Sequence, residues 1–214
     1  MDDRDVEDRA VERLREAVSR MAQQIRGRAP SGRTHDDADD IVGTFSTDDA
    51  VGFDPLPLLR TLYDHGARPV VIGQVAGIMH GSREPTGDLD LLWDGTPEQA
   101  RAMAAAFASM SAELTDDDGR PLPCEAATLA LPKVRFRTPN ASGDCCTPAL
   151  EWGDLSVADF LGRCRVARAD GFEIRYLERA DLIRMRRAVG RVKDVRRAEE
   201  LEELRALDEE RSAP

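Results

Sequence analysis

Apolar positions follow two periods along the chain, one typical of helices near the N-terminus and one typical of strands in the middle. Near the N-terminus, five apolar residues are spaced alternately three and four apart: Val11, Leu14, Val18, Met21 and Ile25. This seam predicts an amphipathic helix over residues 4–26. The seam is equally consistent with packing on the body of the protein and with packing on a second copy, which would make a dimer through this helix.

The pattern changes after this helix. Residues 27–52 are rich in Gly, Ser, Thr and Asp, which indicates an acidic flexible linker. We therefore expect residues 1–52 to form a separate amphipathic helix plus this linker, and residues 53–214 to form the globular domain. Within that domain we expect a main α/β part over residues 53–170, followed by a C-terminal strand and helices over residues 171–214.

Inside the domain, helical and strand patterns alternate irregularly. Thr96 followed by Pro97 is typical of a helix start. Helices are expected over residues 54–66, 74–80, 96–110, 179–190 and 192–210. Strands are expected over residues 67–73, 88–94, 127–131, 133–138, 143–150 and 171–177, and residues 115–123 are rich in turn formers. This mixture predicts an α+β (α/β-like) fold, with a small mixed sheet flanked by helices and a helical C-terminal third.

Composition indicates a soluble globular protein. A chain of 214 residues that is 41% hydrophobic and 33% charged can bury one good core. No run approaches the roughly 18 apolar residues of a membrane span, and the charged N-terminus is unlike a secretory signal. The four cysteines lack zinc-ligand spacing, so we expect buried free thiols in a cytoplasmic protein.

Charge is spread unevenly over the chain. The net charge of −11 argues against broad, non-specific affinity for nucleic acid. Residues 179–197, however, carry eight Arg or Lys against two Asp, a local excess of +6. Such a segment can hold a phosphate-bearing ligand at one place, or it can be a solvated basic helix face.

Asp88 and Asp90 are candidate metal ligands. In a strand, alternate side chains share a face, so these two carboxylates would point the same way about 7 Å apart. Together they can bind hard cations such as Mg²⁺ or Mn²⁺ through oxygen. Taken alone, such a short pair in an aspartate-rich chain is more typical of two exposed aspartates at the start of a strand.

The preceding segment favours the metal interpretation. A buried strand ends at Gly73 and Gln74, a short helix follows, and the acidic strand begins at Asp88. A glycine turn lets backbone amides approach phosphate oxygens. The acidic strand beside it can hold the Mg²⁺ ions that the same phosphates bind.

This arrangement resembles the polymerase-beta-type nucleotidyltransferase superfamily, in which a hydrophobic residue, Gly, and Gly or Ser precede Asp-hydrophobic-Asp/Glu-hydrophobic. The matching residues here are Ile72, Gly73, Gln74, Asp88, Leu89, Asp90 and Leu91. The sequence of this segment is similar to that of the minimal bacterial nucleotidyltransferases, including abortive-infection and MenT-like toxins of toxin–antitoxin pairs. Gln74 departs from the family's Gly or Ser, and its side chain could crowd a triphosphate or supply an extra donor.

The resemblance implies further site residues. It implies a third metal-binding carboxylate at Asp144, which spacing alone would leave as a turn aspartate. A later family segment carries Lys, Arg and Asp, matched here by Arg186, Arg191 and Asp194. Arg186 keeps the charge of the family's Lys but presents a planar fork. On one continuous helix, Arg186 and Arg191 would stand about 140° apart, so they need not touch the same phosphate.

Residues after the short helix complete the implied site. Ser82, Arg83 and Thr86 are implied nucleotide contacts, because the corresponding residues lie near the nucleotide in the resembling enzymes. His80 is expected to pack at the end of the short helix. The two tryptophans are expected in the core or at its rim: Trp93 and Trp152.

The resemblance implies a two-metal nucleotidyl transfer from a nucleoside triphosphate to an acceptor hydroxyl. Asp88, Asp90 and Asp144 would hold Mg²⁺, and Arg186 or Arg191 would neutralise developing charge. The acceptor stays open among RNA such as a tRNA 3′ end, a protein side chain and a small molecule, and a toxin would have an antitoxin partner. The alternative is a catalytically weak nucleotide-binding or protein-interaction module of the same fold.

Overall fold

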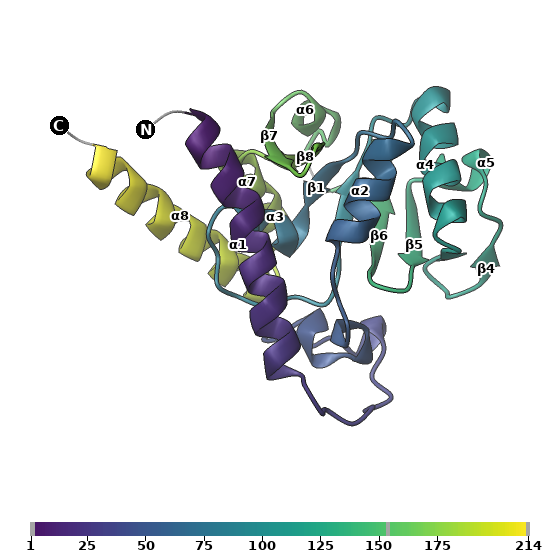
Figure 1. The fold of residues 1–214 in the computed structure, drawn as a ribbon, viewed down its shortest axis with the longest axis horizontal. Helices are drawn as coiled ribbons and strands as arrows, with labels where there is room; N and C mark the ends of the chain where they lie inside the picture. The colour runs from purple at the N-terminus through teal and green to yellow at the C-terminus, as the bar shows by residue number, and fades with distance from the viewer. Residues whose placement is uncertain (1–2, 153–154, 213–214) are drawn as a thin grey trace.

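A computed structural model describes residues 3–152 and 155–212, and its centre is one eight-stranded mixed sheet covered by helices (Figure 1). The strands are β1 Val70–Ile72, β2 Asp90–Leu92, β3 Glu113–Thr115, β4 Pro121–Leu122, β5 Lys133–Arg137, β6 Ser142–Cys146, β7 Cys164–Ala169 and β8 Phe172–Leu177. The helices are α1 Asp3–Gln24, α2 Leu56–Asp64, α3 Gly73–Met79, α4 Pro97–Ser109, α5 Ala126–Leu129, α6 Ala158–Leu161, α7 Arg179–Val189 and α8 Val192–Ser212. Three short 3₁₀ helices lie between α1 and α2: η1 His35–Asp37, η2 Thr44–Ser46 and η3 Asp48–Ala50. The α+β class and the helical C-terminal region are as predicted.

The order of strands in the sheet is β4-β3-β5-β6-β2-β1-β8-β7. β1 pairs antiparallel with β2 and parallel with β8, while β2 pairs parallel with β6. β6, β2, β1 and β8 therefore lie side by side in the sheet, although they come from residues between 70 and 177 of the chain. Their apolar side chains join those of α2, α3, α4 and α7 in one core.

Several predicted elements are confirmed, and their local signals explain them. In α2, Leu58, Leu59 and Leu62 are buried, as the helical spacing requires. The Thr96 side chain accepts a hydrogen bond from the backbone N–H of Gln99, so Thr96 is the N-cap of α4.

The strands of the structure differ from the prediction in three places. Residues 127–131 were expected as a strand, but Ala126–Leu129 form α5. The turn-rich stretch 115–123 holds the end of β3, a turn at Gly119 and β4. β7 was not expected at all, and it forms a hairpin with β8 through Asp170 and Gly171, both at positive φ. This two-residue Asp-Gly turn is a strong hairpin signal.

The β7–β8 hairpin also crosses the expected internal boundary between residues 170 and 171. β8 continues the sheet beside β1, with Val70 opposite Arg175. Residues on the two sides of that boundary therefore belong to one sheet.

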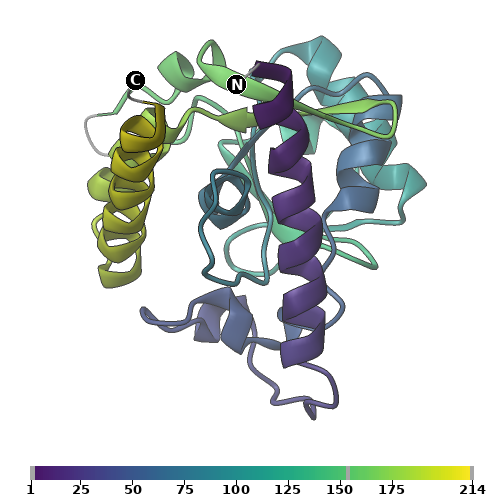
Figure 2. The same ribbon diagram turned by 60° about the vertical axis from the view of Figure 1, so that its left-hand side comes forward.

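The N-terminal helix was expected as a separate element, and the structure places it on the body instead. α1 contacts α3 and β7, and its seam residues Val11, Leu14 and Met21 are at most 4% exposed. Figures 1 and 2 show α1 crossing the molecule, with its first turn near the last turn of α8. The apolar seam is thus already covered within a single chain.

Residues 27–52, which we call the strap, were expected as a flexible linker and instead lie against the domain. Figure 2 shows the strap turning back at the end of α1 and passing near the start of α8. Its polar residues form an internal hydrogen-bond network: the Asp48 carboxylate accepts from the backbone N–H groups of Ser31 and Gly32. The guanidinium of Arg28 donates to the carbonyl oxygens of Phe45 and Thr47. Gly, Ser, Thr and Asp thus supply turns and hydrogen bonds here rather than disorder.

Among the described helices, none combines the length and the apolar composition that crossing a membrane would need. All four cysteines are free, with Cys145 and Cys146 buried and Cys124 and Cys164 half-buried.

Candidate active site

Two of the predicted acids stand side by side on neighbouring strands. β2 and β6 run parallel, with Leu91 opposite Cys145 and Leu92 opposite Cys146. One residue earlier on each strand, this register places Asp90 beside Asp144, and their side chains share one face of the sheet. Sequence spacing could not have paired these residues, because 53 positions separate them.

Two glycines make this approach possible. A Cβ atom at Gly73 would lie 1.9 Å from Oδ2 of Asp90, and Gly73 has a φ of +64°. A Cβ atom at Gly143 would lie 1.9 Å from the carbonyl oxygen of Leu89. Any larger residue would push α3 off Asp90 or push β6 off β2.

Asp88 lies just before β2 rather than within it, so the third acid approaches from a loop. Its Oδ1 accepts hydrogen bonds from two hydroxyls, that of Thr86 and that of Thr44 at 2.8 Å. Thr44 belongs to the strap, which gave no sequence signal for this contact.

The electrostatics of the three acids reflect burial and mutual repulsion. Burial raises the pKa of Asp90 well above its ordinary value, and the neighbouring Asp88 and Asp144 raise it further. Burial also raises the pKa of Asp144, while Lys133 and His35 act in the opposite direction. A bound cation would offset the negative charge that these three carboxylates concentrate in one place.

The carboxylate oxygens of Asp88, Asp90 and Asp144 are ligands that suit Mg²⁺ or Mn²⁺. In this structure, Asp88 and Asp144 contact other protein groups instead. Within the described residues, no three His, Cys, Asp or Glu side chains are already grouped as metal ligands. Asp88 instead faces two threonines, and Oδ2 of Asp144 lies 3.7 Å from Lys133 Nζ. The other oxygen of Asp144, Oδ1, is buried and has no hydrogen-bond partner among the residues that the structure describes. A buried, unpaired carboxylate oxygen beside two further carboxylates fits an oxygen-ligated cation.

A pocket of about 630 Å³ opens over these acids. Its acidic floor is surrounded by six basic side chains: Lys133, Arg135, Arg186, Arg191, Lys193 and Arg197. One wall is apolar and comes from β6, α7 and the segment after β6: Cys146, Leu150, Trp152, Leu182, Met185 and Val189. The strap supplies the remaining wall: His35, Asp36, Ala38, Asp40 and Thr44. A ligand with both anionic and flat apolar parts matches this lining.

Two of the three basic residues of β5, Lys133 and Arg135, line the pocket and were not predicted as site residues. Lys133 and Arg135 alternate along the strand, and Arg135 is opposite Asp144 in the antiparallel register. Both therefore stand on the same face as the acids. Arg135 also forms an ion pair with Asp36 of the strap at 2.9 Å. The alternation in KVRFR was visible in the sequence, but the identity of the neighbouring strand was not.

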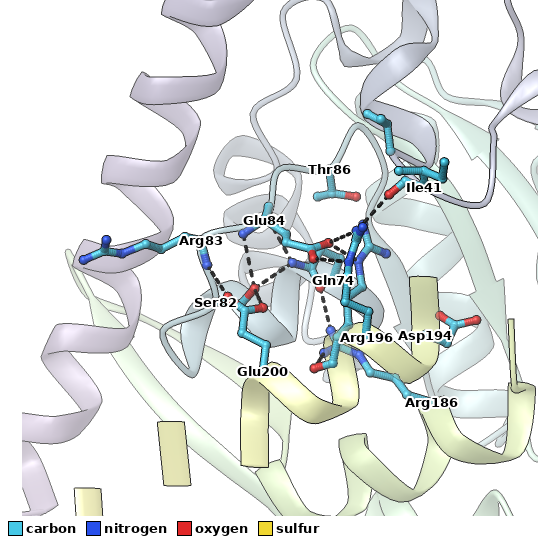
Figure 3. Close-up of polar contacts among 12 residues, drawn as sticks. Ile41, Gln74, Ser82, Arg83, Glu84, Thr86, Arg186, Asp194, Arg196 and Glu200 are labelled. Carbon is cyan, nitrogen blue, oxygen red and sulfur yellow. Dashed lines mark hydrogen bonds and ion pairs between the residues drawn. The ribbon is translucent and has the colours of Figure 1, made fainter. Parts of the chain in front are cut away.

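Gln74 does not extend freely toward the pocket, because protein groups engage its amide (Figure 3). Its Nε2 donates to Ser82 Oγ at 3.0 Å and to the Glu84 carbonyl oxygen at 2.9 Å. Its Oε1 accepts from Arg186 Nη2 at 2.6 Å. The side chain is 3% exposed. Gln74, where the resembling enzymes have Gly or Ser, thus links α3, the following loop and α7.

Arg186 is equally committed to the protein. Its guanidinium donates to the carbonyl oxygens of Gly73 at 3.2 Å and Arg197 at 2.8 Å. Burial lowers the pKa of Arg186 to about 10, and the nearby Arg197 contributes. The planar fork reaches acceptors in several directions, which the single ammonium of a lysine would not do.

Arg191 and Asp194 form a separate pair at the pocket. α7 ends at Val189, and its C-cap residue Gly190 has a φ of 71°, so Arg191 is not on the same helix as Arg186. The expected angle of about 140° between them therefore does not apply. Arg191 Nε donates to Asp194 Oδ2 at 2.6 Å, and the Arg191 side chain is 53% exposed.

Three implied nucleotide contacts lie outside the pocket. Ser82 is buried, and its hydroxyl donates to the Glu200 carboxylate. Figure 3 shows the Arg83 side chain directed away from this network, and Arg83 does not line the pocket. Thr86 is 1% exposed and contacts Asp88 rather than the pocket. As expected, His80 packs at the end of α3, where its ring lies 5.0 Å from that of Tyr176.

Comparisons with known protein families, with curated proteins and with solved structures found no match for this chain.

Proposed function

We propose that this protein is a Mg²⁺-dependent nucleotidyltransferase, which moves a nucleoside monophosphate from a nucleoside triphosphate to an acceptor hydroxyl. One observation carries the proposal: Asp90 and Asp144 stand side by side on β2 and β6, with Asp88 adjacent, beneath a basic pocket. The resemblance of Gly73 and of the Asp88–Asp90 motif to polymerase-beta-type nucleotidyltransferases supports the same reaction.

The three acids would hold the cations, and Mn²⁺ is an alternative to Mg²⁺. When bound, such ions supply a more acidic acceptor hydroxyl and neutralise the leaving pyrophosphate. Asp144 would also orient that hydroxyl, since its buried Oδ1 has no hydrogen-bond partner among the described residues. The acceptor oxygen then bonds to the α-phosphorus, the hydroxyl proton is released, and the bond to pyrophosphate breaks.

The basic residues of the pocket would bind the phosphates. Lys193 and Arg197 are one helical turn apart at the start of α8, so both face the pocket together. Arg191, half exposed and next to them, is available to move onto a phosphate. Arg186 would act indirectly, because its guanidinium holds the Gly73 turn and Gln74. The nucleobase would lie on the apolar wall beside Trp152.

The acceptor is proposed only by class: RNA, a protein side chain or a small molecule. The basic segment 179–197 loses weight as an RNA-binding surface, because several of its residues face the pocket and others pair with acids. Arg184 pairs with Asp181, and Arg187 pairs with Glu202. A role as a toxin with an antitoxin partner rests on the resemblance alone.

Calorimetry with each Mg²⁺–nucleoside triphosphate tests binding, and an α-labelled triphosphate with total lysate tests transfer. Asp88→Asn and Asp90→Asn should abolish transfer. Asp64→Asn, an exposed change on α2, is the matched control and should leave transfer intact. Absence of triphosphate binding by the unchanged protein would refute the proposal. Binding without transfer to RNA, protein or small molecules would favour the nucleotide-binding module instead.

A further inference from the structure

The strap contacts the acidic centre directly through Thr44. Its hydroxyl donates to Asp88 Oδ1 at 2.8 Å and lies 3.2 Å from the Thr86 hydroxyl. The hydroxyl oxygen of Thr44 also accepts a hydrogen bond from the backbone N–H of Gly87 at 3.1 Å. Thr44 is 7% exposed, so these hydrogen bonds are shielded from water.

The loop before β2 is shaped to receive the strap. A Cβ atom at Gly87 would lie 2.6 Å from the Thr44 carbonyl oxygen and 2.9 Å from Ala50 Cβ. Glycine at this position thus allows the strap backbone to pass directly against Asp88. The close fit is a second observation, independent of the hydrogen bond, that couples these two segments.

The strap itself holds Thr44 in place from several sides. The Thr47 hydroxyl donates to the Thr44 carbonyl oxygen at 2.7 Å. Arg28 donates to the carbonyl oxygens of Phe45 and Thr47, which both follow Thr44 in the same turn. The hydroxyl of Thr44 therefore reaches Asp88 from a preorganised turn, at little further entropic cost.

We propose that Thr44 is a positioning residue, which orients the Asp88 carboxylate for cation binding. Thr44 and Thr86 both donate to Oδ1, and no hydrogen bond to Oδ2 is present in the described residues. The two hydroxyls fix the carboxylate plane and leave Oδ2 for a cation. The inference rests on the proposed function in one respect only, that Asp88 is a cation ligand. Partners that orient ligating carboxylates commonly contribute tenfold or more to metal affinity.

The test measures Mn²⁺ affinity by electron paramagnetic resonance, without nucleotide or turnover. Thr44→Val should weaken Mn²⁺ binding about tenfold. Thr44→Ser keeps the hydroxyl and should bind within about threefold of the unchanged protein, even if Thr44→Val folds poorly. Ser46→Ala removes a hydroxyl of the same turn, which donates to the Gly43 carbonyl oxygen at 2.9 Å. It should bind Mn²⁺ like the unchanged protein.

A comparison in the Asp88→Asn background separates positioning from general loosening of the strap. If Thr44 acts through Asp88, adding Thr44→Val to Asp88→Asn should weaken Mn²⁺ binding no further. Equal Mn²⁺ affinity of Thr44→Val and the unchanged protein would overturn the inference alone. The inference would also be overturned if Ser46→Ala weakened Mn²⁺ binding as much as Thr44→Val does. It would likewise be overturned if the Thr44→Val, Asp88→Asn double variant bound Mn²⁺ more weakly than Asp88→Asn alone. If Asp88→Asn does not alter Mn²⁺ binding, both the inference and the proposed function fail.

Discussion

Arg186 Nη2 donates to the side-chain oxygen of Gln74 at 2.6 Å, and both side chains are buried. This hydrogen bond supports a third role for Gln74, different from the two that the sequence left open. Its amide has no free N–H group to offer a ligand, because Ser82 and the Glu84 carbonyl oxygen accept both of them. Gln74 instead connects the turn at Gly73 to α7.

Gln74→Ser should therefore lower the stability of the protein. The change removes three hydrogen bonds and leaves the Arg186 guanidinium with one acceptor fewer. We expect the free energy of unfolding to fall by about 2 kcal/mol, measured by urea denaturation. Gln24→Ser, an exposed change at the end of α1, should alter it by less than about 0.5 kcal/mol. A Gln74→Ser protein as stable as the unchanged one would contradict the structural role.

The same chemical change at Arg186 and Arg191 should have unequal effects. Arg186→Lys loses a fork that reaches Gly73, Gln74 and Arg197, so we expect a loss of about 2–3 kcal/mol. Arg191→Lys can still pair with Asp194 at a half-exposed position, so we expect a loss below about 1 kcal/mol. Urea denaturation of both variants in parallel provides the measurement, and losses of equal size would count against a structural role for Arg186.

Asp90→Asn should stabilise the metal-free protein while abolishing transfer. Burial together with the charges of Asp88 and Asp144 disfavours the ionised form of Asp90, which is why its pKa is raised. A neutral side chain of the same shape removes that repulsion, so we expect a gain of about 1 kcal/mol at neutral pH in EDTA. Thermal unfolding measures it, with Asp64→Asn as the control. A less stable Asp90→Asn protein would show that the carboxylate is satisfied without a cation.

His80 should make the protein sensitive to mild acid. Its imidazole is buried, Nε2 lies 2.8 Å from the Leu177 carbonyl oxygen, and burial lowers the pKa of His80 to about 3. The charges of Arg179, Arg165 and Arg13 act in the same direction. Because the unfolded chain binds the proton near pH 6.5 and the folded chain does not, stability is full above that pH and falls toward pH 3.

Comparing unfolding free energies from pH 7 to pH 4 tests this prediction. The slope attributable to His80 approaches about 1.4 kcal/mol per pH unit, and His80→Gln should remove it. His65→Gln, at an exposed histidine after α2, should leave the slope unchanged. Parallel curves for the unchanged protein and His80→Gln would refute the prediction.

Sequence patterns predicted the helices and strands that are determined by residues close together in the chain. The seam of α1, the Thr96 cap of α4 and the strand before Gly73 each depend on neighbours within a few residues. The Asp170-Gly171 turn was an equally local signal for β7 and was overlooked. By contrast, the pairing of β2 with β6 depends on contacts between distant segments, so only the resemblance pointed to Asp144.

The ordered structure of the strap could not be predicted from the sequence for a different reason. Its order comes from polar contacts, such as the Asp36 pair with Arg135 and the Thr44 hydrogen bond to Asp88. Polar contacts of this kind leave no period in the sequence, and the same composition is typical of disordered linkers. Lys193 and Arg197 were missed for a related reason, since a basic helix reveals its charge but not the direction in which it faces.

The position of the strap also limits where the protein can be shortened. Cutting before Phe53, where the apolar pattern of the domain begins, would keep Asp88, Asp90 and Asp144. It would nonetheless remove a wall of the pocket, the Thr44 contact with Asp88, and the helix that covers α3 and β7. The newly bared apolar surface of α3 and β7 would promote aggregation. The smallest fragment that keeps the described site intact therefore runs from α1 to α8.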